Sequence, residues 1–315
     1  MAFVTRLLQL IPVWLAISLL AFGLGHLTPG DPARLVAAQL SDGPPSNELV
    51  ARVRTELGLD KPLPIQYVYW LGNIVQGDWG TSFRTGNAVL TELVRRFPAT
   101  LRLAALAFVI SVVVAPTLGV LAALYKGSVI DQFSRLLALV GASLPSFWLA
   151  FMLIIVFSVN LKWLPVSGQG SWQHLILPAT SLSLISLPSL MRLTRSSLLD
   201  VLQEDYLRTA QAKGLRQRWV ILKHALRNAF IPVVTVAGMS LGHLLGGAAI
   251  IEIVFAYPGV GKFLIDSIGN RDYPVIQAYV LFLGTIFVVI NLLIDVVYTL
   301  LDPRISLDQK HAQHV

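Results

Sequence analysis

Six long stretches without a charged side chain dominate this sequence of 315 residues. The stretches free of Asp, Glu, Lys and Arg are residues 7–30, 103–125, 136–161, 163–191, 228–251 and 273–294. Lipid offers no partner to an unpaired backbone amide, so a chain crosses about 30 Å of hydrocarbon as a helix of roughly 20 apolar residues. The sequence therefore predicts an all-α polytopic membrane protein with six transmembrane helices, the fourth beginning near His174.

The composition agrees with membrane insertion and excludes several other classes. Hydrophobic residues make up 55% of the chain, charged residues 13%, and the mean hydropathy is +0.69, which is too apolar for a soluble domain. The net charge of +7 is spread between the apolar runs, so it indicates membrane topology and no nucleic-acid partner. Arg6 precedes the first run as in a signal peptide, but the run is long and contains Pro12, so we expect a retained helix.

The sequence contains no motif typical of a catalytic site or a metal site. Cysteine is absent, which excludes disulfides and thiolates, and the six histidines show no metal-ligand spacing. The run Pro258 to Phe263 invites a phosphate-loop interpretation, which fails because Ala256 replaces the first glycine and Phe263 the magnesium-binding hydroxyl. We expect no metal site, no cofactor and no enzymatic activity in this chain.

Lysine and arginine collect in alternate loops, and short cytoplasmic loops are the ones that carry such charge. The turn between the second and third runs has Lys126 and Arg135. The loop between the fourth and fifth runs has Arg192, Arg195, Arg208, Lys213, Arg216, Arg218, Lys223 and Arg227, whereas the opposite short loops have only Lys162, Lys262 and Arg271. Both termini are therefore expected in the cytoplasm, and residues 31–102 outside it.

This extracytoplasmic segment is expected to be helical. Ser46 precedes apolar residues at helical spacing and Gly58 follows them, which is typical of an N-cap and a helix stop. A second helical pattern comprises Tyr67, Trp70, Leu71, Ile74 and Val75, whose aromatic members suit a membrane–water boundary. Packing within the chain and binding of a partner both remain open for this second helix.

The loop between the fourth and fifth runs has a chemistry of its own. Residues 204–232 read EDYLRTAQAKGLRQRWVILKHALRNAFIP, which predicts two short helices with a hinge at Gly214. Glycine there permits a positive φ or a close backbone approach. After it, Leu215, Trp219 and Leu222 form an apolar edge among basic residues. The edge suits a lipid interface, an intramolecular cap or a groove on another protein equally well.

This loop resembles the EAA loop of ATP-binding-cassette (ABC) importer permeases, in the dipeptide, oligopeptide and nickel family. Similar stretches include TPGDPA, LGLDKPLPIQY, GDWGTSF, RRFPATLRL, WLPVSG, WQHLILPA, IIEIVFAYPGVGKF, NRDYPVIQAY and LDPRI, so the resemblance covers essentially the whole chain. WQHLILPA and NRDYPVIQ look most like the B-type subunits of nickel permeases. The chain departs from the family's Glu-Ala-Ala start, because Asp205 and Tyr206 follow Glu204.

The resemblance implies a type I ABC importer permease fold in the bacterial inner membrane. It implies a second homologous permease, two ATP-binding subunits that hold ATP and Mg, and an extracytoplasmic solute-binding protein as partners. The implied ATPase-coupling residues are Glu204, Ala212, Gly214, Leu215 and Trp219. The implied cargo is a peptide, a glutathione-like molecule, nickel or a metal chelate.

The expected division of the chain is residues 1–30 as the first transmembrane helix, 31–102 as the extracytoplasmic segment, 103–301 as the transmembrane core with the coupling loop 199–228, and 302–315 as a cytoplasmic tail. In the fifth run, Met239, His243, Gly246 and Gly247 are candidates for lining the pathway. The alternative is that His243 bonds a neighbouring helix and the glycines serve packing. The rival function is an ion-coupled secondary transporter, which would need paired intramembrane carboxylates or inverted repeats.

Overall fold

The computed structural model describes residues 2–27, 31–41 and 43–301, and its secondary structure there is helical apart from an isolated bridge between Thr81 and Ala88. The chain divides into two compact units, each described by itself. One unit combines residues 1–98 with 262–289, and the other combines 99–261 with 290–315. The expected tail 302–315 and the end of the first apolar run, 28–30, lie outside the described residues.

Among the described residues, three helices are long and apolar enough to cross a membrane: Val89–Leu124, Gln217–Val254 and Tyr273–Ile294. Two sharply bent pairs raise the number to as many as five in the described part of the chain, if each pair is one span. A shorter apolar helix, Leu10–His26, lies within the first predicted run. The predicted membrane-embedded helical architecture is thus present, whereas the count of six spans remains a prediction.

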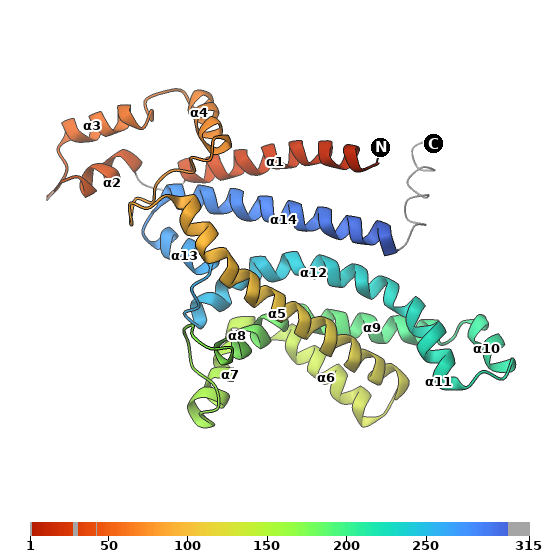
Figure 1. Cartoon of the computed structure of the whole chain (residues 1–315). Coiled ribbons are helices and arrows are strands. Elements are labelled where there is room, and N and C mark those ends of the chain that lie inside the picture. Colours follow the sequence, from red (N-terminus) through yellow and green to blue (C-terminus); the bar gives the residue numbers. More distant parts are fainter. Residues whose placement is uncertain (1, 28–30, 42, 302–315) are drawn as a thin grey trace. The chain divides into compact units, whose positions relative to one another are not determined.

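The first unit is built around two helices that lie side by side and run in opposite directions, α1 (Ala2–Leu27) and the part of α14 (Tyr273–Leu301) up to residue 289 (Figure 1). Trp14 of α1 donates a hydrogen bond of 3.0 Å to Thr285 Oγ1 of α14. The unit also contains α2 (Pro32–Gln39), α3 (Asn47–Glu56), α4 (Leu63–Val75), the first turns of α5 (Val89–Leu124) and most of α13 (Val260–Gly269).

The predicted helix signals around α3 are confirmed. Ser46 is the N-cap, and its hydroxyl accepts a hydrogen bond from the Leu49 amide. Gly58 follows the helix with a φ of 64°, and the Leu59 amide donates back to the Arg54 carbonyl. This left-handed glycine satisfies carbonyls at the helix end. Together α2 and α3 enclose a small apolar core of Ala33, Ala37 and Val53.

The second unit contains most of α5 and the helices from α6 to α12. Their bounds are α6 Val129–Ser143, α7 Ser146–Leu153, the π-helical turn Ile154–Asn160, α8 Gln173–Ser183, α9 Leu187–Val201, α10 Asp205–Ala212, α11 Gln217–Trp219, the π-helical turn Val220–Ala225 and α12 Leu226–Val254. The core between α5, α6, α9 and α12 contains Leu187, Leu190, Met191 and Val233.

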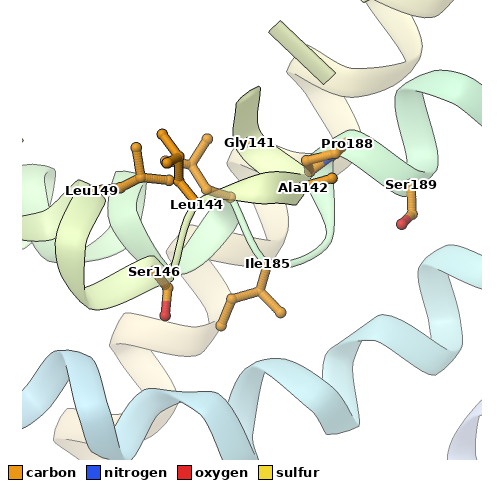
Figure 2. A pocket seen from close by; sticks show the side chains of 9 residues that line it. Gly141, Ala142, Leu144, Ser146, Leu149, Ile185, Pro188 and Ser189 are labelled. Carbon is orange, nitrogen blue, oxygen red and sulfur yellow. The ribbon is translucent and has the colours of Figure 1, made fainter. Parts of the chain in front are cut away.

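Two helix pairs in this unit are broken beside prolines. The α6–α7 pair bends by 112° next to Pro145, and the α8–α9 pair bends by 56° just before Pro188. Proline lacks the amide hydrogen that a continuous helix requires. The two breaks border a hollow of about 300 Å³ (Figure 2). A Cβ on Gly141 would lie 2.9 Å from the Pro188 ring, so this glycine allows the two broken pairs to approach.

Candidate functional site

The predicted hinged pair of helices is present between α9 and α12. Glu204 ends the turn that follows α9, its side chain is exposed, and its carbonyl accepts from the Leu207 amide. Helix α10 comes directly after it, with Ala212 exposed in the last turn. Helix α10 lies beyond the end of α9 in Figure 1, where it forms a projecting part of the second unit. The five coupling residues predicted from the resemblance are all exposed and lie along one stretch of chain, residues 204–219.

One face of α10 is anchored to the rest of the unit. The Leu207 side chain is only 2% exposed and belongs to a cluster with Ala123 of α5, Leu198 of α9 and Ala229 of α12. Tyr206 adds a hydrogen bond, because its hydroxyl accepts from the Asn228 side-chain amide at 2.7 Å. Burying a leucine contributes roughly 2 kcal/mol, so displacement of α10 is resisted by three helices at once.

Gly214 ends α10 through its backbone conformation. Its φ is 82°, in the left-handed region, and the Leu215 amide donates back to the Ala210 carbonyl at 3.4 Å. A Cβ built on Gly214 meets no atom within 4 Å. Of the two roles that the sequence left open, the positive φ is present here, and no close approach occurs within the described part of this chain.

The apolar edge after the hinge is exposed. Leu215, Trp219 and Leu222 have relative exposures of 44%, 53% and 62%, whereas Val220 between them is buried against α10 and α12. Residues 217–254 form one helix from α11 through the π-helical turn into α12. A force applied at Trp219 would therefore act directly on α12. Arg216, Arg218 and Lys223 are also exposed and make this surface basic.

An ion pair that the sequence did not predict braces the same region. The Asp131 carboxylate, in the first turn of α6, accepts from Arg195 Nε at 2.7 Å and from Arg195 Nη2 at 2.9 Å. The Gly127 amide donates to the same carboxylate at 2.9 Å, and the Asp131 side chain is 2% exposed. Such a two-pronged pair fixes geometry as well as charge. It joins the α5–α6 turn to α9, the helix that leads into α10.

The candidate pathway residues of α12 separate into two groups. Met239 and His243 are exposed, and a Cβ on Gly246, one turn further on, would meet no atom within 4 Å. These three residues share one face of the helix. Gly247 faces α8 and the break after it instead, because a Cβ there would lie 2.7 Å from the Ile185 side chain in the break and 3.7 Å from that of Leu182 in α8. Gly247 therefore serves packing, and an exposed face remains for the other three.

The glycines of residues 258–263 have a structural reason. Glu252 is fully buried at the end of α12, and Thr100 of α5 donates a hydrogen bond to its carboxylate. A Cβ on Gly259 would overlap this carboxylate, and one on Gly261 would lie 2.5 Å from Ala249. Burial raises the pKa of the neighbouring Tyr257 phenol above its ordinary value. The segment thus closes around a buried acid.

Two further findings concern ligands and relatives. Within the described residues no three His, Cys, Asp or Glu side chains are grouped as a metal ion would require. The fold is similar to that of a chain of the MetNI methionine ABC transporter, solved in an inward-facing conformation, with a TM-score of 0.55. The two sequences are 21% identical, and the match covers 68% of this chain and 97% of the MetNI chain. This likeness shows a type I ABC importer permease fold.

Sequence comparison extends over nearly the whole chain. Residues 115–307 match the family described as "binding-protein-dependent transport system inner membrane component", and residues 1–104 match the N-terminal family of such membrane components. The glutathione transport system permease protein GsiC of Salmonella typhimurium is 46% identical over 95% of this chain and 97% of its own length. The GsiC protein of Escherichia coli K12 is 45% identical over 96% and 97%. The chain therefore belongs to the binding-protein-dependent inner membrane component family, the permeases of ABC importers of the peptide and nickel type.

Proposed function

We propose that this chain forms part of the translocation path of an ABC importer and is driven by ATP hydrolysis on separate subunits. The observation that supports this most strongly is α10 with its exposed apolar edge at Leu215 and Trp219. An exposed apolar edge among basic side chains suits the groove of a partner protein. On this proposal, residues 199–228 are the coupling loop, with Glu204, Ala212 and Gly214 at its family motif positions.

The mechanical route from the coupling loop runs along α12. The partner would press on Leu215 and Trp219, and the continuous helix over 217–254 would carry the displacement toward Met239 and His243. The Leu207 cluster and the Asp131–Arg195 pair keep α5, α6 and α9 moving with the loop. Met239, His243 and Gly246 then line the path, and Gly247 holds α12 against α8.

The proposed partners are a second permease, two ATP-binding subunits and an extracytoplasmic solute-binding protein, assembled in the inner membrane with both termini of this chain in the cytoplasm. ATP and Mg would bind the partners. The proposed cargo is a peptide-like solute, because relatives that match almost the whole chain are named as glutathione permeases. The segments resembling nickel permeases, WQHLILPA and NRDYPVIQ, are helix and turn residues, exposed at their starts and buried further on, as at Leu177 and Val275.

Reconstitution tests this proposal. The chain is purified with its co-isolated subunits, placed in proteoliposomes, and assayed for uptake of glutathione, dipeptides and nickel with the binding protein present. We expect uptake of a peptide-like solute that requires ATP in the compartment facing the coupling loop. Uptake by this chain alone, driven by an ion gradient, would instead establish the secondary transporter. Uptake of nickel without peptides would overturn the cargo assignment alone.

A further inference from the structure

We infer that α4 is embedded in the outer leaflet of the bilayer, where its outward face contacts phospholipid. The contact of α4 with lipid does not depend on the transport function, whereas the choice of the outer leaflet rests on the proposed orientation with both termini in the cytoplasm. The extracytoplasmic segment then consists of two different parts. Helices α2 and α3 stand in water, whereas α4 lies at the membrane interface.

The position of α4 along α1 sets its depth. Tyr67 of α4 shares a hydrogen bond of 2.8 Å with Ser18 of α1, and the Trp70 ring lies 5.7 Å from that of Phe22. Ser18 is nine residues before the end of α1 at Leu27, which corresponds to about 13 Å along a helix. These contacts fall within the uncharged run 7–30, so α4 meets α1 at the depth of the hydrocarbon. In Figure 1, α4 crosses α1 near the end that leads to α2.

The face of α4 that points away from α1 is apolar and uncovered. Val68, Tyr69 and Val75 are exposed by 66%, 59% and 74%, and Leu63 and Ile65 are exposed beside them. Asn73 is the polar exception, near the C-terminal end. The helix contains no Asp, Glu, Lys or Arg between Leu63 and Val75. In water this face would be a costly apolar patch, whereas hydrocarbon accepts it.

The charges at the ends of α4 fit an interfacial position. Lys61 stands just before the helix with its ammonium group 4.2 Å from the Tyr69 ring centroid, and Asp78 follows the helix. A lysine beside a tyrosine is typical of the headgroup level, where a polar tip meets water and an apolar body meets lipid. As a helix, α4 satisfies its interior backbone groups within itself, as hydrocarbon requires, and Pro62 and Pro64 at its start have no amide hydrogen to satisfy.

Helix α3 provides the contrast. Its ten residues include Glu48, Arg52, Arg54 and Glu56, and the Arg52–Glu56 pair is 76% and 58% exposed. Such a helix belongs in water. If a binding protein docks on the extracytoplasmic segment, the lipid assignment of α4 leaves α2 and α3 as its contact helices, a consequence that rests on the proposed function.

The absence of cysteine allows a direct test with single spin labels. The assembled complex is placed in lipid nanodiscs with a label at V68C, at R52C in α3 as the aqueous reference, or at L20C, an exposed position of α1, as the hydrocarbon reference. Collisions with oxygen report lipid, and collisions with water-soluble chromium oxalate report water. We expect V68C to lose chelate access and gain oxygen access relative to R52C, as L20C does.

Three results would overturn the inference. Chelate access at V68C equal to that at R52C would place α4 in water. Low access to both reagents would mean that protein covers this face, whether a second permease or the binding protein. Chelate access at L20C would remove the premise that α1 lies in hydrocarbon. A second label at I65C repeats the measurement on the same face, in case the Val68 substitution disturbs α4. None of these measurements requires transport, so failure here and failure of the proposed function are distinguishable.

Discussion

Replacement of Gly214 by alanine should weaken coupling through backbone strain alone. The residue has a φ of 82°, which an L-amino acid with a Cβ adopts only at a cost. The space around it is open, since a Cβ meets no atom of the described chain within 4 Å. The substitution therefore adds no clash with this chain, and any loss of loop stability comes from the strain of placing alanine at a positive φ.

The size of the effect follows from that strain. A left-handed L-residue costs about 1–2 kcal/mol, which lowers the population of the hinged loop by about 5- to 30-fold. Asparagine tolerates this region better, so Gly214→Asn should lose less than Gly214→Ala. The assay is ATP-driven uptake in proteoliposomes, together with cargo-stimulated ATP hydrolysis. We expect uptake to fall for alanine, and to be partly retained for asparagine.

A matched control exists in the other unit of the chain. Gly77 also has a positive φ, 89°, with no atom within 4 Å of a Cβ, and it ends α4 in the same way. Gly77→Ala should introduce similar strain and leave the ratio of uptake to ATP hydrolysis unchanged. Parental uptake in Gly214→Ala would refute the reasoning. An equal loss of uptake in the alanine and asparagine variants would instead indicate that Gly214 contacts a partner protein closely.

The other predictions concern the supports of the loop. Leu207→Ala should destabilise the anchor of α10 by about 2–5 kcal/mol, seen as faster hydrogen exchange in residues 205–212, and unchanged exchange would contradict the packing. Asp131→Asn removes the carboxylate that pairs with the Arg195 guanidinium, so it should lower the thermal midpoint of unfolding far more than the control Glu56→Gln. The Arg52–Glu56 pair is exposed, and losing it should change the free energy of unfolding by about 0–1 kcal/mol. Equal shifts of the midpoint in the two variants would argue against the bracing role. Gly259→Ala should lower the detergent-stable fraction, because its Cβ would displace the buried Glu252 carboxylate. A second change, Glu252→Ala, should partly restore that fraction, and no restoration would place the strain elsewhere.

Local patterns predicted much of this architecture because membrane helices and caps depend on neighbouring residues. Uncharged runs located the helical segments, and Ser46 and Gly58 located the ends of α3. The hinge at Gly214 followed from its position between two amphipathic patterns. In each case the controlling residues lie within a few turns of the feature.

Contacts between residues far apart in the sequence could not be predicted from these local patterns. Asp131 and Arg195 are 64 residues apart, and nothing in the spacing of charges within their loops singles out this pair. Gly259 and Gly261 suggested a phosphate loop, whereas their absent side chains make room for Glu252. The pattern in α4 identified Tyr67 and Trp70 as one face, but only packing revealed that this face lies on α1 and that Val68 and Tyr69 point outward.

The central claim is that the edge bearing Trp219 docks an ATP-binding subunit, and photo-cross-linking tests it most directly. A benzophenone amino acid replaces Trp219 in the assembled complex, and a second variant carries it at Trp172, which is 72% exposed in the loop before α8. We predict that irradiation joins the Trp219 variant to the ATP-binding subunit and leaves the Trp172 variant without that adduct. A complex that transports normally yet gives no adduct at Trp219, or the same adduct at both positions, would contradict the account.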